Sequence, residues 1–376
     1  MMKHYLLFVA ALSVNVNHNN ALTGRSSSKR KNKSATPSSR GGFGTPKRPS
    51  EANPAQYTPD SSSTTRELVR YLEQEECEGI GADGGTEIGF CSKTNRRGLF
   101  AADDFQTGDF LVGIPFPCCL TLAEDDIMMG EPTDAELGLR LLNLFNDKSR
   151  SVSFQSYFDT FPTRKERFDA TPDFWSTKEI EELEFPPIIQ KAKKRKTSIE
   201  QLAQAEVVDI ADLQFATWLV KSRGFTLLKP SLTEPVGNDD NVETRTTLIS
   251  KTVLMPYLDM INHNVPESAN AELQVLETKA EDESFYALQA TRSIRKGSEI
   301  MITYGTGQES TVDMLLNYGF VAEKNSNDSK FISEENLADF PWSSTLEDEK
   351  KALAETGDEI KRKILDFRIR MKKSVK

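Results

Sequence analysis

The sequence predicts an α+β fold, in which short strands near both ends of the folded region enclose a helical block. Strand-like runs occur at residues 98–102 and 110–114, and again at 252–255, 272–276, 285–290 and 299–303; between the two groups, apolar residues recur at the spacing of helices. A chain of 376 residues is long enough for one large domain or two modest ones. We therefore expect a β domain that carries an all-helical insert at 121–250.

The first part of this domain, residues 65–120, opens with a predicted helix at 65–76. Leu68, Val69 and Leu72 recur at helical spacing, and Thr64 or Thr65 precedes them as a candidate N-cap. The glycine-rich stretch 79–89 is typical of a loop. Two strands follow, and the second begins after a turn at 107–109.

The middle block has helical periodicity in two segments. Leucines repeat at helical spacing over 136–145, and apolar residues do the same over 198–220. Between them, Ser176 precedes Glu179 by three residues, which is the signature of a capping box before a short helix. We interpret this block as the helical insert.

Strand character returns in the third part, residues 251–322, where a turn at 294–298 separates two of the strands. The remaining tail, 323–376, is charged and has an apolar rhythm at Ile360, Leu365 and Ile369. Such a pattern is compatible with a docked or an exposed helix, and we expect an exposed one.

The N-terminus has the features of a targeting leader. A short apolar run follows Lys3 and His4, which predicts a signal peptide at 1–23. Residues 24–64 are rich in Ser, Lys and Arg, as in a transit peptide or a disordered linker. Together they predict delivery to a plastid or another organelle. The alternatives are plain secretion, or the cytoplasm or nucleus with the basic runs as an address. We exclude residues 1–64 from the predicted fold.

Charge and cysteine usage limit the function classes. The first 50 positions contain nine of the 47 Lys and Arg residues and none of the 57 Asp and Glu residues. The rest of the chain is therefore strongly acidic. An acidic body argues against nucleic-acid binding; it suits a basic peptide partner, although solubility explains the same charge. The four cysteines lack CxxC spacing, so we expect no metal site. No apolar run is long enough to span a membrane, and we expect a monomer without a membrane partner in the mature form.

Two segments carry most of the functional signal. Residues 255–263 form an apolar run that ends in Asn262 and His263, and His263 is the only histidine after residue 18. About forty residues later, Tyr304 and Gly305 end a second strand-like run. This pattern suggests a site that holds a cofactor with main-chain groups and carries out its chemistry beside a phenol.

These segments belong to an ordered set. The set comprises Arg97-Gly98-Leu99-Phe100-Ala101 with Gly108-Asp109 and Ile114-Pro115 downstream, Ser156 to Pro162, Phe174-Trp175-Ser176, Val220 to Phe225, Pro256 to His263, Lys296 to Tyr304-Gly305, and Leu316 to Phe320. In this order, from about Asn95 to about Ala322, the chain resembles the SET-domain methyltransferases of the Rubisco large-subunit methyltransferase class. The resemblance implies a SET fold of short curved sheets with a knot-like C-terminal threading.

The resemblance implies S-adenosylmethionine as the methyl donor and a protein lysine as the acceptor. Arg223 offers a planar, permanently charged group to the donor's carboxylate. The side-chain oxygen of Asn262 suits its ammonium, and His263 is assigned for its main chain against adenine. Phe320 is a candidate for stacking on adenine, or else a core aromatic residue. The full set of expected cofactor residues is Arg97, Gly98, Leu99, Arg223, Asp259, Asn262, His263 and Phe320.

Tyr304 is the predicted catalytic residue. Methyl transfer is an in-line displacement, so alignment supplies much of the acceleration. The acceptor must be a neutral amine, and deprotonating a free lysine at pH 7 costs about 4–5 kcal/mol because its pKa is about 10.4. An apolar channel lowers this cost, and we expect Phe225, Tyr257 and Tyr318 to form its aromatic walls.

Alternatives of other classes remain at this point. Relatives that methylate histidine replace the aromatic residue at position 225 with a polar one, so Phe225 favours lysine. A non-catalytic relative could use the fold only to bind a peptide, although such a module would need neither Asn262-His263 nor Tyr304. The identity of the methylated protein is not encoded in these motifs.

Overall fold

The computed structural model describes residues 57–126, 130–147, 152–163, 170–232, 246–278 and 284–375. The predicted signal peptide and most of the basic segment lie outside these residues. Among the described helices, none combines the length and apolar character that crossing a bilayer requires. The helices are α1 (Ser63–Gln74), α2 (Gly81–Gly84), α3 (Asp134–Asn146), α5 (Gln155–Phe158), α6 (Thr177–Glu181), α7 (Pro186–Glu206), α8 (Ile210–Arg223), α9 (Thr311–Tyr318), α10 (Asn327–Glu334), α11 (Leu346–Glu355) and α12 (Glu359–Ser374).

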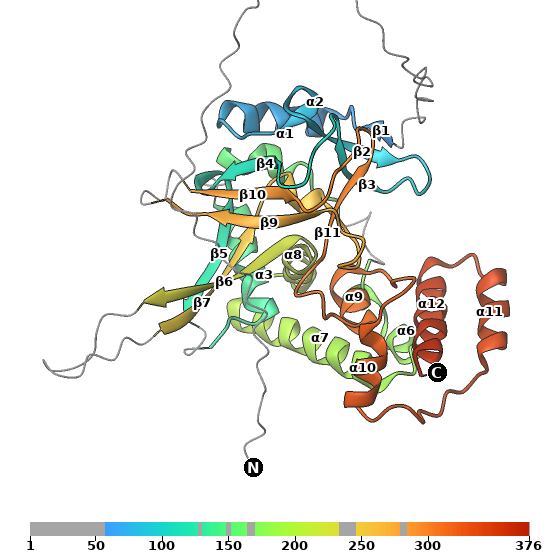
Figure 1. The fold of residues 1–376 in the computed structure, drawn as a ribbon. Coiled ribbons are helices and arrows are strands. Elements are labelled where there is room, and N and C mark those ends of the chain that lie inside the picture. The colour runs from blue at the N-terminus through green and yellow to red at the C-terminus, as the bar shows by residue number, and fades with distance from the viewer. Residues whose placement is uncertain are drawn as a thin grey trace, which may run out of the picture.

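The described strands form three small sheets (Figure 1). The first has the order β1-β2-β3-β11-β8, the second β4-β10-β9 and the third β5-β7-β6. Their bounds are β1 (Tyr57–Pro59), β2 (Thr86–Cys91), β3 (Arg97–Ala101), β4 (Phe110–Pro115), β5 (Leu120–Asp126), β6 (Gly224–Leu232), β7 (Thr246–Leu254), β8 (Asn262–His263), β9 (Ala271–Leu276), β10 (Phe285–Ala290) and β11 (Glu299–Ile302). The α+β class is therefore confirmed.

The folded region begins before residue 65, contrary to the prediction. Strand β1 pairs antiparallel with β2, and Tyr57 stacks on Phe100 with ring centroids 4.4 Å apart. Helix α1 begins at Ser63, and its N-cap is Ser62, whose side chain accepts a hydrogen bond from the main-chain N–H of Thr65. Three residues are too few to show a strand pattern, which is why the sequence did not reveal β1.

The block at 121–250 is not all-helical. Its two ends form the sheet β5-β7-β6, and helices α3, α5, α6, α7 and α8 lie between these strands in the sequence. The prediction of a strand at 252–255 covers only the end of β7, which begins at Thr246. The earlier residues of β7 are also rich in β-branched side chains, which favour strands. The predicted helical run at 198–220 is also broken: Val207 adopts a left-handed conformation with φ 56° and ends α7 before α8 begins.

The capping box predicted at Ser176 is confirmed. Its side chain accepts a hydrogen bond from the N–H of Glu179, and the Glu179 carboxylate accepts one from the N–H of Ser176. Helix α6 therefore begins at Thr177 and positions its buried residue Ile180 against the C-terminal helices.

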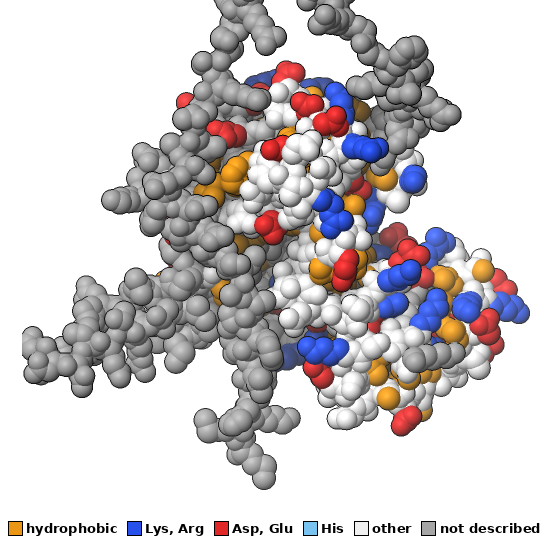
Figure 2. Space-filling view, in the orientation of Figure 1, with side chains coloured by type: hydrophobic (Ala, Val, Ile, Leu, Met, Phe, Trp, Pro, Cys, Tyr) orange, Lys and Arg blue, Asp and Glu red, His pale blue; other side chains and the backbone are white. Residues whose placement is uncertain are grey.

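The C-terminal tail is docked, so the expectation of an exposed helix is wrong. Helices α10, α11 and α12 gather beside α6 and α9 (Figure 1). Ile364, Phe367 and Met371 of α12 are at most 1% exposed and share an apolar cluster with residues of α6, α7 and α9. Some charged residues of the tail lie on its surface, where acidic and basic side chains are interspersed (Figure 2), and others, such as Arg368 and Glu349, are buried in ion pairs.

Candidate functional site

The two segments that carried the functional signal lie side by side. Strand β8 pairs in parallel with β11, with Met301 opposite Asn262 and Ile302 opposite His263. On its other edge, β11 pairs antiparallel with β3, which contains Gly98. Three segments that are distant in the sequence therefore meet on adjacent strands, and Tyr304 lies two residues after the end of β11.

Tyr304 is held at three points. Its main-chain N–H donates to Nδ1 of His263 at 3.0 Å, and its hydroxyl donates to the main-chain oxygen of Ile261 at 2.6 Å. Its ring lies against that of Tyr318, with centroids 4.7 Å apart. Because Nδ1 of His263 accepts, the proton of a neutral His263 ring is on Nε2.

Burial determines the protonation state of both rings. It raises the pKa of the Tyr304 phenol well above its ordinary value, so this group stays protonated at neutral pH. Burial also lowers the pKa of His263, although the nearby Glu309 carboxylate opposes the effect. The phenol is thus suited to orient a reacting group by hydrogen bonding and not to act as a base.

Phe320 and Tyr318 complete an aromatic cluster around His263. The Phe320 ring lies 5.7 Å from the His263 ring and 6.2 Å from the Tyr318 ring. The residue between them, Gly319, ends α9 with φ 77°, and a Cβ there would overlap the main-chain oxygen of Ala170. Only glycine allows this turn without strain, and the turn brings both aromatic side chains to the same cluster.

Asn262 has its amide oriented by the neighbouring strand. Its Nδ2 donates to the main-chain oxygen of Arg97 at 2.8 Å and to Oε1 of Glu299 at 2.7 Å. Both donor hydrogens are therefore used, and the side-chain oxygen remains as the acceptor that was predicted for an ammonium. Gly98 makes this close approach possible, since a Cβ there would lie 2.7 Å from Nδ2 of Asn262 and 2.8 Å from Oε1 of Glu299.

We expect Gly98→Ala to damage this site and the fold together. The added methyl group must displace the Asn262 amide, and overpacking of this kind costs about 1–3 kcal/mol. We expect two quantities to be lower than in the unsubstituted protein. One is the cofactor affinity, measured by calorimetry, and the other is the free energy of unfolding, measured by chemical denaturation. Gly357→Ala is the matched control, since its Cβ would meet nothing within 4 Å. Equal cofactor affinity for Gly98→Ala and the unsubstituted protein would contradict the role of this glycine.

Arg223 and Asp259 form a buried ion pair. Nη1 of Arg223 lies 2.7 Å from Oδ2 of Asp259, whose side chain is fully buried. The same oxygen accepts a hydrogen bond from the Tyr157 hydroxyl at 2.9 Å. The Arg223 guanidinium also lies 5.2 Å from the centroid of the Phe161 ring. Burial lowers the pKa of Arg223, but Asp259 and the neighbouring Tyr157 together outweigh it and raise the pKa, so the guanidinium stays charged and fixed in direction.

Two of the predicted cofactor residues contribute little beyond their main chain. Arg97 directs its side chain to the start of α1, where Nε lies 2.9 Å from Asp60 and Nη2 donates to Thr65 at 2.6 Å. Leu99 is fully buried and lies opposite Ile300 in the β3–β11 pair. For both residues, the structure leaves the backbone as the part that can contact a cofactor.

Tyr257 does not occupy the position expected of a channel wall. It is fully buried, and its hydroxyl contacts the N–H of Gly81 at 3.2 Å and Oγ1 of Thr86 at 3.1 Å. Its φ of 73° is unusual for a residue with a Cβ and directs the side chain towards β2 and α2. This geometry argues against a channel role. Phe225, in contrast, is partly buried in β6, two residues after Arg223 at the end of α8.

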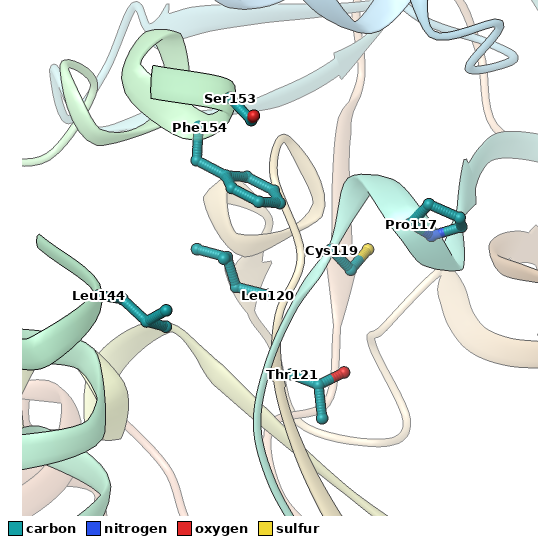
Figure 3. Close-up of a pocket in the computed structure, with 7 residues that line it drawn as sticks. All are labelled: Pro117, Cys119, Leu120, Thr121, Leu144, Ser153 and Phe154. Carbon is teal, nitrogen blue, oxygen red and sulfur yellow. The ribbon is translucent and has the colours of Figure 1, made fainter. Parts of the chain in front are cut away.

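Two cavities border this region. One of about 130 Å³ is lined by His263, Val265, Pro266, Glu267, Gly307, Glu309, Met314, Ala322, Asn325, Ser326 and Asn327. The other, of about 340 Å³, lies between the start of β5 and the helical insert, where Phe154 and Leu144 lie on the same side as the Leu120 side chain (Figure 3). No predicted site residue lines the larger cavity, so we place the chemistry at the smaller one and the aromatic cluster.

The site residues fit the methyl donor that the resemblance implies. Oδ1 of Asp259 is buried and has no hydrogen-bond partner among the described residues, so it is an unused acceptor close to Arg223. Such a donor needs a partner for each of its groups. The fixed guanidinium suits its carboxylate, the Asn262 oxygen suits its ammonium, and the cavity beside His263 has room for its base.

Three contributors were not predicted as site residues. Tyr157 lies in the aromatic segment 156–162, which is part of the resemblance. The sequence does not predict the hydrogen bond that its hydroxyl donates to Asp259. Glu299 follows the turn at 294–298, and only the strand pairing reveals that it orients Asn262. Glu309 had no sequence signal, because its position depends on the backbone turn at Gly305, where φ is 61°.

Comparisons with known proteins agree with this geometry. A family model described as "SET domain" matches residues 96–305. The N-lysine methyltransferase setd6 of Salmo salar is 25% identical over 285 residues, which cover 69% of this chain and 60% of that protein. Protein SET DOMAIN GROUP 40 of Arabidopsis thaliana is 33% identical over 101 residues, or 21% of this chain and 20% of that protein. The chain therefore spans less than two thirds of these relatives.

Solved structures support the fold. The SET domain of LSMT bound to lysine and AdoHcy aligns with a TM-score of 0.58 and 14% identity, covering 84% of this chain and 90% of that one. Rubisco LSMT bound to AdoMet aligns with a TM-score of 0.56 and 14% identity over the same shares. At this identity the likeness concerns the fold alone.

Proposed function

The chain belongs to the SET-domain family, and we propose that it is a protein-lysine N-methyltransferase that uses S-adenosylmethionine. One observation carries the proposal: the parallel pairing of β8 with β11, which joins Asn262-His263 to the anchored phenol of Tyr304. The similarity to an N-lysine methyltransferase and to a fold that binds lysine and AdoHcy supports the same activity.

Each part of the site has a physical role in this reaction. When bound, the donor supplies an electrophilic methyl group on a sulfonium. The Arg223 guanidinium binds the carboxylate end of the donor, and the Asn262 oxygen accepts from its ammonium. The Tyr304 hydroxyl, protonated and fixed beside the Ile261 oxygen, orients the acceptor nitrogen. Partly buried aromatic side chains exclude water and favour the neutral form of the amine.

Lysine is favoured over histidine as the acceptor. Phe225 contributes a partly buried apolar ring at the start of β6, and such a ring has no polar group to hold an imidazole. The aliphatic stem of a lysine packs well against it. A peptide-binding module without catalysis would not require the ordered Asn262 amide or the anchored Tyr304 hydroxyl.

Labelling with radioactive S-adenosylmethionine tests the proposal. We expect the purified protein to label one or a few proteins in an extract of cells that lack this chain, with the methyl group on lysine by mass spectrometry. Label confined to histidine would support the alternative acceptor. Absence of S-adenosylmethionine binding by calorimetry would instead support the peptide-binding module.

We further propose that the protein acts as a monomer in a plastid or another organelle, on a protein that presents a lysine. The apolar run after Lys3 and the acid-free segment up to Ser50 support this location. A fluorescent fusion tests it, and a purely cytoplasmic or nuclear signal would contradict it.

A further inference from the structure

Arg195 is a nearly buried arginine that the mechanism above does not use. It lies in the middle of α7, within the helical insert, and 9% of its side chain is exposed. Two carboxylates of the insert neutralise it: Nε lies 3.1 Å from Oδ2 of Asp134, and Nη1 lies 3.2 Å from Oδ2 of Asp173. The Thr171 hydroxyl donates to the same oxygen of Asp173 at 3.1 Å. The guanidinium is therefore fixed in direction by the insert.

The same guanidinium also reaches the C-terminal end of α9, which lies beside α7 (Figure 1). Nη1 donates to the main-chain oxygen of Leu316 at 3.1 Å, and Nη2 donates to Oδ1 of Asn317 at 2.6 Å. Main-chain oxygens in the last turn of a helix have no intrahelical donor, and a cation there interacts favourably with the helix dipole. Helix α9 has no basic residue of its own in its last turn. Arg195 therefore supplies this cation from α7.

This end of α9 leads directly into the aromatic wall beside the predicted catalytic phenol. Tyr318 follows Asn317 in the chain, and the Tyr318 ring lies 4.7 Å from the ring of Tyr304. The hydrogen bond from Arg195 to Asn317 is thus made one residue away from that wall. A displacement of about 1 Å in a reacting pair can cost about a hundred-fold in rate. Turnover should therefore depend on how firmly the last turn of α9 is held.

We propose that Arg195 is a positioning residue for methyl transfer, which holds the last turn of α9 on the helical insert and thereby fixes Tyr318 beside Tyr304. The inference rests on the proposed function, since the placement of these two rings matters to turnover only in a methyltransferase. It gives the insert a part in the reaction as well as in the fold. Arginine suits this role better than lysine, because its planar fork can donate to Leu316, to Asn317 and to the insert's carboxylates at once.

The donor side of the site has a separate support. Gly319 packs on the main-chain oxygen of Ala170, where a Cβ would overlap it, and its N–H donates to main-chain oxygens of α9 at 3.1 Å. Phe320, the candidate adenine contact, follows this fixed turn. Weakening the Arg195 contacts should therefore lower turnover and leave the affinity for S-adenosylhomocysteine nearly unchanged.

Arg195→Lys is the first test, because it keeps a positive charge for the insert's carboxylates and loses the fork that reaches Asn317. Tritiated S-adenosylmethionine is the donor, and an extract of cells that lack this chain is the acceptor. The initial rate over a range of extract concentrations gives an apparent maximal rate and an apparent KM. Per S-adenosylhomocysteine-binding site, counted by calorimetry, we expect the maximal rate to fall about ten- to a hundred-fold. The apparent KM and the Kd of S-adenosylhomocysteine should change little.

Asn317→Leu is the second test, since it leaves the ion pairs of Arg195 intact and removes only the acceptor of Nη2. It should lower the maximal rate as Arg195→Lys does. The double variant should be no slower than the slower single variant, because both substitutions remove one interaction. Lys191→Met is the control: it breaks the pair of 2.8 Å with Asp313 between the same two helices, at the other end of α9, and should keep the full rate.

The outcomes separate the two claims. If the unsubstituted protein labels no protein, the proposed function fails, and this inference falls with it. If it labels lysine and either Arg195→Lys or Asn317→Leu keeps the full rate, the proposed function stands and the positioning role is overturned. The role is also overturned by additive losses in the double variant, by an equal loss in Lys191→Met, or by an equal weakening of S-adenosylhomocysteine binding. Each of these results would assign Arg195 to stability alone.

Discussion

Replacing Tyr304 with phenylalanine should lower methyl-transfer turnover by about a hundred-fold or more, which is the effect expected when a reacting pair loses its alignment by about an ångström. The substitution removes only the hydroxyl that donates to the Ile261 oxygen. The main-chain hydrogen bond to His263 and the ring contact with Tyr318 remain. Cofactor affinity, measured by calorimetry, should therefore change little.

The pH dependence of this variant separates orientation from base catalysis. Because burial raises the pKa of Tyr304, the phenol is protonated across the neutral range and does not titrate there. Any rise in turnover between neutral and alkaline pH should then come from deprotonation of the acceptor amine, and Tyr304→Phe should show the same rise at a lower rate. Loss of that rise in the variant would assign the phenol a role as the base.

Tyr257→Phe is the matched control for the loss of a buried hydroxyl. Its hydroxyl contacts Thr86 and Gly81, outside the Tyr304 cluster. We expect a cost of about 1–3 kcal/mol in the free energy of unfolding, because the N–H of Gly81 and the buried Thr86 hydroxyl lose this partner, with turnover retained. Equal turnover for Tyr304→Phe and the unsubstituted protein would remove Tyr304 from its assigned role.

The sequence predicted the strands and the residues of the site better than their arrangement. Alternation and turn residues indicated the strands β3, β4, β9, β10 and β11, because each has a local pattern that its neighbours support. Asn262, His263 and Tyr304 were recognisable from their order in the chain. The contact between these residues could not be predicted from the sequence. Strand β8 has only two residues, and no local pattern indicates its parallel pairing with β11.

Side-chain direction was the least predictable property. Tyr257 lies in the same run as Asn262, yet a φ of 73° turns it towards Thr86 instead of Tyr304. Glu309 reaches the site only because Gly305 lacks a Cβ. Both depend on single backbone angles, and composition and periodicity contain no information about such angles.

The tail shows how an amphipathic pattern can be misread. Ile360, Leu365 and Ile369 indicated one apolar stripe, and the many charges around it suggested exposure. In the structure several of those charges are buried in pairs. Arg368 lies 2.6 Å from Glu349 and 2.9 Å from Glu184, and Lys372 lies 2.6 Å from Glu349. Charged residues in a sequence do not mark an exposed face when they can neutralise one another.

Deleting residues 326–376 should therefore abolish cooperative folding and activity together. The deletion removes Ile364, Phe367 and Met371 from a cluster that also contains Leu315 and Leu316 of α9. Loss of one buried phenylalanine side chain costs about 3–5 kcal/mol, and the whole domain has only about 5–15 kcal/mol of stability. Helix α9 also leads into Tyr318 and Phe320, so the aromatic cluster around His263 should lose its support.

A point substitution in α12 tests the contribution of the docked tail to stability without removing the tail. Arg368→Ala leaves Glu349 with one fewer partner, and breaking a buried ion pair costs about 3–5 kcal/mol. Lys330→Ala is the control, because the Lys330–Glu334 pair is exposed and such pairs contribute at most about 1 kcal/mol. Chemical denaturation measures both free energies.

The outcome that would contradict both predictions concerns the deletion of residues 326–376. A chain truncated in this way that unfolds cooperatively and transfers methyl groups at the full rate would show that the docked helices are dispensable to the site.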